Sequence, residues 1–224
     1  MAEWTDPMSE DDRRQAVVDL LAVLALAELT AFERLAADAS LAPTLADKAA
    51  LGAMAVAEFG HYQVLHDRLA TLGVDSTVAM SPFVEPLNAF HDSTAPANWL
   101  ESLVKAYVGD GFAADFYREV AELMDDATQS LVGDVLDDTG HAEFAVAHVR
   151  SAIEADPAVA GRLALWARRL IGEALVQAQR VAVERDAMAR LLVGGEGGLT
   201  EVAQLFERLT KRHGERMESL GLRA

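Results

Sequence analysis

Apolar residues recur every three or four positions along most of this chain, which is the spacing of an amphipathic helix. The stretch AVVDLLAVLALAELTAFERLAADA, residues 16–39, is the clearest case. Ser9, followed three residues later by Asp12, resembles a capping box at the start of this helix. Thr44 and Asp47 mark the start of a second helix that runs to Gly73. No stretch keeps the strict alternation that a half-buried strand needs, so the pattern predicts an all-α protein.

The helical pattern is interrupted by residues 74–98, which hold three prolines and predict a long crossover rather than a hairpin turn. A third helix is expected to start at Asn98, with Glu101 in its first turn, and to end near residues 124–127. A fourth should then run to about Asp156. Two helical hairpins joined by a long crossover form the up-down-down-up plan of a ferritin-like four-helix bundle.

Two further helices are predicted beyond this bundle. Asp156 and Pro157 fit the N-cap and first turn of a fifth helix, and GGEGG at residues 194–198 separates it from a sixth. We therefore expect one domain over residues 1–224, with the bundle core at about 10–156 and additional helices at about 157–193 and 200–221. The additional helices either pack against the bundle or form an oligomer contact, such as a homodimer interface.

Composition excludes several kinds of chemistry. The 224 residues include no cysteine, which rules out disulfides, thiolate zinc sites, cysteine-ligated iron–sulfur clusters and cysteine nucleophiles. The polar, acidic N-terminus is unlike a secretory signal. The longest apolar run, AVVDLLAVLALAEL, contains Asp19 and Glu28 and is shorter than the ~20 residues of a membrane span. We expect a cytoplasmic protein that does not cross a membrane.

Charge is distributed unevenly along the chain. The net charge is −17, and residues 1–160 hold 8 basic and 28 acidic residues, whereas residues 161–224 hold 11 basic and 8 acidic residues. A strongly negative body repels polyphosphate, so unaided nucleic-acid binding by the bundle is disfavoured.

Each predicted bundle helix carries one carboxylate on its apolar face, and the second and fourth helices add a histidine three residues later. Glu28, for example, shares its helix face with Leu21, Leu24 and Leu35. A buried carboxylate costs several kcal/mol unless it is paired, and a pair of divalent cations removes that cost for all of them together. The candidate metal ligands are Glu28, Glu58, His61, Asp110, Asp138 and His141.

The height of these residues along the bundle is an independent test. Glu28 is about 11 residues before its helix ends and Glu58 about 14 after the next begins, so both lie ~16–21 Å from the same connection. Asp110 and Asp138 are matched in the same way across the second hairpin. Two alternatives remain at this stage. Asp115 replaces Asp110 if the third helix is rotated or bulged, or the polar groups form a buried network without metal.

The other histidines are assigned lesser roles. We expect His66, His91 and His213 to lie on the surface or in loops. His148 lies two turns beyond His141 on the same stripe and is either a support for a metal ligand or a satisfied core histidine.

Four stretches carry a family resemblance: AELTAFERLAADA, EFGHYQVL, AYVGDGFAADFYREVA and DTGHAEFAV. They resemble the non-haem di-iron proteins of the ferritin-like superfamily, and within it the MiaE-like branch. That branch is named after a hydroxylase that acts on the isopentenyl group of a hypermodified tRNA adenosine. The resemblance covers roughly residues 12–190.

The resemblance implies a site with two iron ions, or manganese in their place. Glu58 and Asp138 would bridge the metals and the two histidines would be terminal ligands. The family usually has Glu where this chain has Asp110 and Asp138, and aspartate reaches ~1.5 Å less. The implied activity is O2-dependent hydroxylation of an unidentified organic substrate, with an electron donor. Because of the charge, we expect a small or carrier-bound substrate rather than tRNA.

Two other functions stay open. One is a ferroxidase-type protein that oxidises and stores iron, although shell ferritins usually lack two long additional helices. The other is a redox-inactive ferritin-like protein that acts through binding alone.

Overall fold

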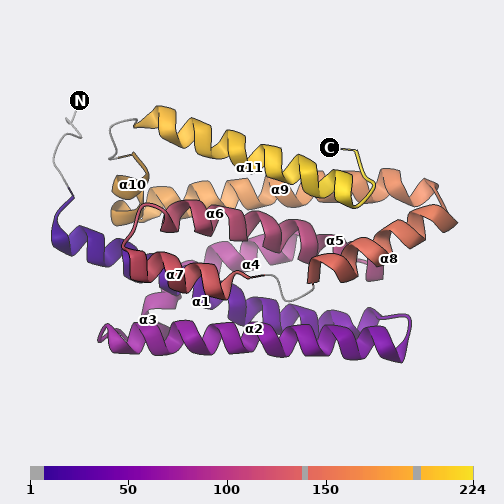
Figure 1. Cartoon of the computed structure of the whole chain (residues 1–224), viewed down its shortest axis with the longest axis horizontal. Coiled ribbons are helices and arrows are strands. Elements are labelled where there is room, and N and C mark those ends of the chain that lie inside the picture. The colour runs from indigo at the N-terminus through magenta and orange to yellow at the C-terminus, as the bar shows by residue number, and fades with distance from the viewer. Residues whose placement is uncertain (1–7, 138–140, 194–197, 224) are drawn as a thin grey trace.

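The computed structural model describes residues 8–137, 141–193 and 198–223, and this described part contains helices and turns but no strand. The first hairpin consists of α1 (Glu10–Asp38) and α2 (Leu45–Thr71). The second runs through α5 (Trp99–Val104), η3 (Lys105–Asp110) and α6 (Gly111–Ala121), and returns through α7 (Asp126–Val135) and α8 (His141–Ala155). Figure 1 shows that α2 and α6 run in the same direction, so the predicted up-down-down-up bundle is confirmed.

The predicted helix starts are confirmed by their caps. Ser9 Oγ accepts a hydrogen bond from the Asp12 backbone N–H at 3.1 Å, and Thr44 Oγ1 accepts one from the Asp47 N–H at 3.1 Å. Asn98 caps α5 in the same way through the Glu101 N–H. Each cap satisfies an N–H group that has no partner within its helix.

The crossover is more ordered than the sequence indicated. It contains α3 (Ser76–Met80), η2 (Ser81–Phe83) and α4 (Val84–Ser93). Helix α4 packs against α9 (Ala158–Glu184) and is fixed at both ends, because Arg169 donates to the Ser93 carbonyl at 2.6 Å and Arg180 pairs with Glu85 at 2.9 Å. The crossover therefore forms part of the wall around the bundle interior.

Two predicted helices are interrupted. The expected third helix changes to π-helical geometry at η3, and the expected fourth helix ends at Val135, since Leu136 and Asp137 are not helical. The predicted single fourth helix is therefore wrong. Aspartate is a poor helix former, and Arg118 donates to the Leu136 carbonyl that the ending leaves open.

The predicted fifth helix is also divided, into α9 and α10 (Asp186–Val193). At the junction the Arg185 guanidinium pairs with Asp19 of α1, a carboxylate that is 2% exposed. Neutralising this buried charge fixes the junction against α1.

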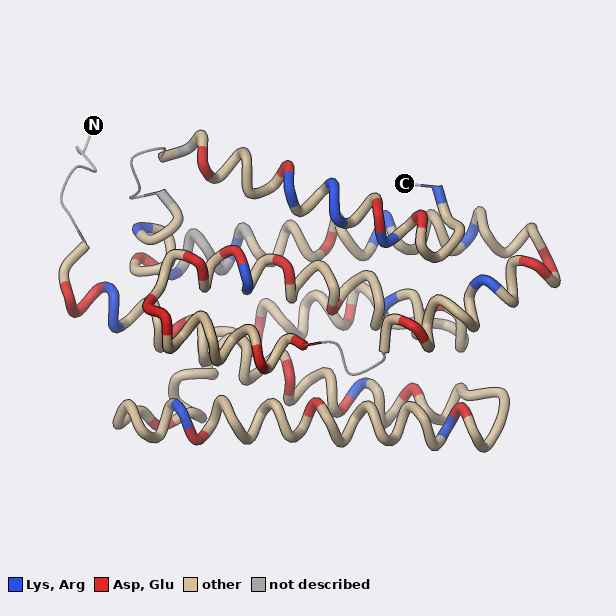
Figure 2. Tube along the Cα trace, in the orientation of Figure 1, with Lys and Arg blue, Asp and Glu red and all other residues tan. Residues whose placement is uncertain are grey.

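The final helix, α11 (Leu199–Ser219), runs beside α6 (Figure 1), and its apolar residues pack with residues of α9. It also covers two carboxylates. Arg208 and Arg212 pair with Glu119, and Arg216 pairs with Asp115. Figure 2 shows blue basic segments along α11. The spacing of Asp115, Arg118 and Glu119 is typical of a solvated helix face, but this interpretation is wrong, because Asp115 and Glu119 are both 5% exposed. The additional helices pack against the bundle.

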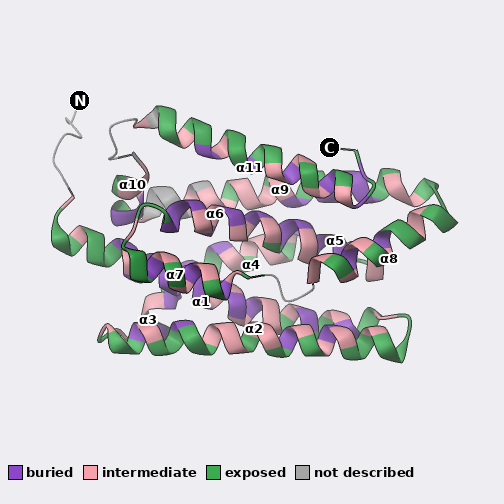
Figure 3. Cartoon of the chain, in the orientation of Figure 1, coloured by how far each residue is buried: buried purple, intermediate pink, exposed green. Residues whose placement is uncertain are grey.

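Burial explains the hydropathy of α1. Residues Glu10–Leu41 are long and apolar enough to cross a membrane by length and composition, which the apolar run alone did not indicate. However, 56% of the most apolar part of this segment is buried inside the protein. Figure 3 shows buried positions on the sides of α1, α6 and α7 that face one another. A core helix of a bundle has this composition.

Candidate metal centre

Two glutamates and a histidine meet between α1 and α2. His61 Nδ1 lies 3.2 Å from Glu58 Oε2 and 3.4 Å from Glu28 Oε2. The possible ligand atoms of the three residues all lie within 4.8 Å of one another. Carboxylate and imidazole together suit iron, manganese and zinc, so this group could hold a metal ion.

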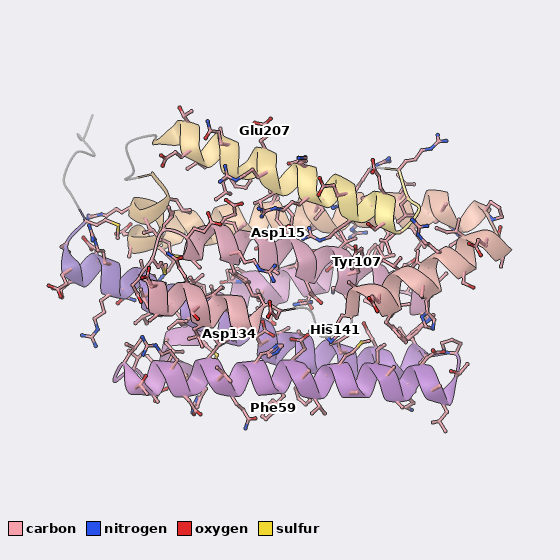
Figure 4. The ribbon with its side chains drawn as sticks, in the orientation of Figure 1. Phe59, Tyr107, Asp115, Asp134, His141 and Glu207 are labelled. Atoms are coloured by element: carbon pink, nitrogen blue, oxygen red, sulfur yellow. The ribbon has the colours of Figure 1, made fainter. Side chains whose placement is uncertain are left out.

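The second hairpin adds two of the predicted residues to the same place. His141 is the first residue of α8, and its Nδ1 lies 3.2 Å from Glu58 Oε1. Figure 4 shows His141 at the start of α8, on the side that faces α2. Asp110 lines the same cavity of about 370 Å³ as Glu28, Glu58, His61 and His141. We call this space the polar cavity.

The π-helical segment positions Asp110. Asp110 is its last residue and is exposed to the polar cavity, although protein surrounds it on all other sides. A π-helical turn inserts one extra residue into a helix and so changes the direction of the side chains that follow. Asp115, the alternative ligand on this helix, does not line the cavity and pairs with Arg216 instead. The structure therefore brings Asp110 to the cluster and keeps Asp115 apart.

The sixth predicted ligand, Asp138, lies outside the described residues. The preceding residue, Asp137, lines the polar cavity together with Arg118. Asp137 was not predicted as a site residue, because in the expected continuous fourth helix its side chain would point away from the core. The assignment of all six residues as metal ligands stays a prediction.

The cluster holds protons when no metal is bound. Burial raises the pKa of Glu28 to about 9, and hydrogen bonds to Glu28 and Glu58 raise the pKa of His61 to about 10. Burial also opposes ionisation of Glu58, but hydrogen bonds from His61 and Glu28 and the charge of His141 outweigh it and lower its pKa. Glu28 is therefore protonated beside an ionised Glu58.

Asp110 and Tyr117 complete this group of ionisable side chains. The pKa of Asp110 is raised to about 8, first by burial and then by the negative charge of Glu58. Burial, with the charges of Glu28 and Asp110, also raises the pKa of the Tyr117 hydroxyl, which stays protonated. Several carboxyl groups that repel one another at close range form a suitable donor set for divalent cations, because the cations replace the protons. The described residues fit a metal site.

The remaining histidines have separate roles. His66 is exposed, as expected, and contacts Ser76 Oγ at 2.7 Å. His148 Nε2 lies 2.9 Å from Asp47 Oδ1, and its Nδ1 lies 2.9 Å from the Phe144 carbonyl, so it joins α8 to α2 as a satisfied histidine. The surface positions expected for His91 and His213 are wrong. His213 is 8% exposed, and His91 lines a second cavity.

This second space, the apolar cavity, has a volume of about 160 Å³ and lies between α1, α4, α6 and α9. Its surface is mainly apolar, with Phe90, Phe112, Phe116 and Leu192 among the lining residues. It shares six lining residues with the polar cavity: Ala27, Ala31, Ala106, Asp110, Ala113 and Tyr117. A small molecule in the apolar cavity would therefore lie directly beside Asp110.

Comparison with known proteins agrees with this architecture. The model of the family described as ferritin-like domain, actinomycetes, matches residues 11–195, and the chain belongs to this family. Among solved structures, the chain is similar to "Protein 19 with aldehyde deformylating oxidase activity" from Synechococcus, with a TM-score of 0.67 and 20% sequence identity. The match covers 100% of this chain and 95% of that chain, and at this identity it shows the fold. A comparison with curated proteins gives no match. The ferritin-like resemblance is thus confirmed, and the MiaE-like branch stays a prediction.

Proposed function

We propose that this protein is an O2-dependent di-iron oxidoreductase that hydroxylates a small apolar substrate. The observation that carries the proposal is the wall shared by the two cavities. Asp110 faces both the group of Glu28, Glu58, His61 and His141 and the apolar cavity. A carboxylate–histidine cluster beside an apolar space is suited to oxidation of a substrate that binds without contacting bulk water.

The cluster residues would hold the metals. Glu58 contacts both histidines, one through each carboxylate oxygen, which supports a role as the ligand shared by the two metals. Glu28, Asp110 and Asp138 would supply the other carboxylates. A reduced iron pair bound there would supply O2 activation and electrons to the reaction. Manganese suits the same ligands.

The chain's own residues would hold the substrate and exclude water. The overall reaction is R–H + O2 + 2 e⁻ + 2 H⁺ → R–OH + H2O, with the electrons delivered by a donor protein. The phenyl rings of Phe112 and Phe116 keep the apolar cavity dry. Because its pKa is raised, the Tyr117 hydroxyl keeps its proton and can donate a hydrogen bond next to Glu28 and Asp110.

Metal analysis tests the proposal. Protein reconstituted with ferrous iron under exclusion of air should bind two ions per chain, ~3.5–4 Å apart, and anomalous diffraction at the iron and manganese edges would identify them. Binding to the folded state should also raise the melting temperature. Protein that binds no iron and melts at the same temperature with and without it would leave only the redox-inactive alternative.

Two further outcomes separate the related activities. Deformylation, the activity in the name of the Synechococcus protein, shortens the substrate by one carbon, whereas hydroxylation keeps all its carbons. Product analysis by mass spectrometry distinguishes them. A hollow assembly of many chains, seen by light scattering, would favour iron storage instead.

A further inference from the structure

Within the described part of the chain, three buried polar atoms that have no hydrogen-bond partner belong to residues that line the apolar cavity. They are Arg34 Nε of α1, His91 Nδ1 of α4 and Gln177 Oε1 of α9. Buried polar groups in proteins are nearly always hydrogen-bonded, and each exception needs an explanation. Three exceptions around one mainly apolar cavity indicate that a ligand with a polar end belongs there.

A fourth polar group strengthens this indication. Lys105 is 7% exposed, and its Nζ donates to the Thr94 carbonyl at 2.8 Å. That is the one hydrogen bond of this ammonium group within the described part of the chain, so further N–H groups can reach a ligand. Its Nζ also lies 5.4 Å from the centre of the Phe90 ring. A buried ammonium group with so few partners is costly unless an anion accompanies it.

The charge of this wall favours an anion. Arg34 and Lys105 are basic, and the acidic residues of the same cavity are Asp38 and Asp110, whose pKa values burial raises and which therefore oppose an anion less than ionised carboxylates would. Burial, with the charges of Lys105 and Arg34, lowers the pKa of His91 to about 3, so its imidazole is neutral. Burial also lowers the pKa of Lys105 to about 8. An added carboxylate would stabilise the charged form of Lys105 and accept from Arg34 Nε.

Gln177 does not oppose an anion. A glutamine amide has nearly the same shape when it is turned over by about 180°, which exchanges the positions of its oxygen and nitrogen. With the amide turned over, its NH2 group donates to the ligand from α9, opposite Arg34 of α1.

The size of the cavity limits the ligand. A dry cavity of about 150 Å³ is known to bind benzene, so about 160 Å³ holds an apolar body of roughly six to ten carbon atoms. Arg34 is six residues beyond Glu28 on α1, or ~9 Å along the helix. The polar end of the ligand therefore lies almost two helical turns from the carboxylate–histidine cluster, and the apolar body extends towards Asp110.

The geometry points to a small monocarboxylic acid as the ligand of the apolar cavity, bound by its carboxylate at Arg34, His91 and Lys105. Its apolar body, and not its carboxylate, then faces Asp110 and the metal cluster. That this acid is the substrate rests on the proposed function, and oxidation would occur on a carbon remote from the carboxylate. Its binding does not depend on metal.

Binding to metal-free protein tests this inference without reference to activity. Isothermal titration calorimetry with octanoate should give one site per chain. Octan-1-ol, which has the same chain length and no charge, should bind at least about ten-fold more weakly, because a hydrogen bond to a charged group is stronger than one to a neutral group. Equal or tighter binding of octan-1-ol would overturn the inference.

Variants locate the site. Arg34→Gln should weaken octanoate binding by about ten- to hundred-fold and leave octan-1-ol unchanged. Arg162→Gln removes an exposed arginine of α9 and should change neither. Ala178→Phe fills the apolar cavity from α9 and should abolish binding of both compounds. Equal effects of the two arginine variants, or full octanoate binding by Ala178→Phe, would contradict the assignment. Circular dichroism confirms that each variant is folded.

Metal titration separates the two proposals. If octanoate binds with the expected pattern and iron does not bind, the ligand assignment holds and the proposed oxidoreductase function fails. If iron binds in the expected amount and octanoate does not, the ligand assignment fails alone.

Discussion

The first residue of α8 contacts a carboxylate in the middle of α2, because His141 Nδ1 lies 3.2 Å from Glu58 Oε1. The other oxygen of Glu58 lies 3.2 Å from His61 Nδ1 on its own helix. Glu58 therefore connects a histidine from each hairpin.

Glu58 and His141 should differ in their effects on metal content. Glu58→Ala removes the group that contacts both histidines, so it should lose both metal ions. His141→Ala removes one terminal ligand and should retain about one ion per chain. The measurement is the metal-to-protein ratio after anaerobic reconstitution with ferrous iron. Full occupancy in Glu58→Ala would show that this residue is not a bridge.

His66→Ala is the matched control for these variants. His66 lies on α2 five residues before its end, is exposed and contacts Ser76 rather than the cluster. Its replacement should leave the metal content unchanged. A loss as large as in His141→Ala would indicate a general effect of histidine removal on folding.

Metal affinity should increase with pH. In metal-free protein the pKa values of Asp110, Glu28 and His61 are raised to about 8, 9 and 10, so all three groups hold protons at pH 7. These protons must leave when the groups become ligands. The affinity for manganous ion should therefore rise from pH 6 to pH 8, with proton release visible by calorimetry in buffers of different ionisation enthalpy. Affinity independent of pH would contradict ligation by these groups.

The same pKa values determine how the stability of metal-free protein depends on pH. The folded-state pKa of Glu28 is above its unfolded value of 4.5, so its contribution to stability is full below that value and is lost as the pH rises to about 9. His61 adds a loss that ends near pH 10. The melting temperature of metal-free protein should fall over this range, whereas that of metal-loaded protein should not.

The up-down-down-up plan, the first two bundle helices and the positions of Glu28, Glu58 and His61 could be predicted, because the local sequence signals there agree with the tertiary packing. Ser9, Thr44 and Asn98 cap their helices as the sequence indicated. Helical spacing placed Glu28, Glu58 and His61 on inward faces, and a rise of ~1.5 Å per residue placed them at one level. Both inferences need only regular helices, and α1 and α2 are regular.

The remaining features depend on contacts between distant segments. Asp115 and Glu119 have the pattern of an exposed face, and only the position of α11 shows that Arg208, Arg212 and Arg216 bury them. Helix α7 can end before Asp138 because contacts with other segments replace the helical hydrogen bonds that are lost there. Those contacts are not visible in the local sequence. Helix α4 was not predicted, because prolines usually interrupt a helix. They are tolerated in its first turn, however.

Gly111 should be essential for the packing of α11. A Cβ added at Gly111 would lie 3.0 Å from Arg216 Cδ and Cζ, and Arg216 is held against Asp115. Gly111→Ala should destabilise the protein by about 1–3 kcal/mol because the buried ion pair must move. Gly133→Ala is the control, since a Cβ there meets nothing within 4 Å, and it should stabilise α7 by about 0.5–1 kcal/mol. Urea unfolding measures both. A stabilising Gly111→Ala would show that Arg216 can move freely.

The last prediction concerns tRNA, the substrate in the name of the MiaE-like branch. The net charge is −17, so a tRNA contact would need the basic residues of the last helices. Several of these residues already contact the protein itself. Arg168 donates to the Arg223 carbonyl at 3.2 Å, Arg169 donates to the Ser93 carbonyl, and Arg212 pairs with Glu119.

We therefore expect no tRNA binding at physiological ionic strength in a filter-binding or anisotropy assay. Each phosphate contact would add about 0.7–0.9 to the slope of log affinity against log salt. Micromolar binding with a slope steeper than about −3 would require several phosphates to be neutralised together and would contradict this prediction. In that case Arg162→Glu, which changes an exposed residue of α9, should weaken binding without disturbing the fold, whereas Arg169→Glu would also release α4. The comparison would show whether α9 is the docking face.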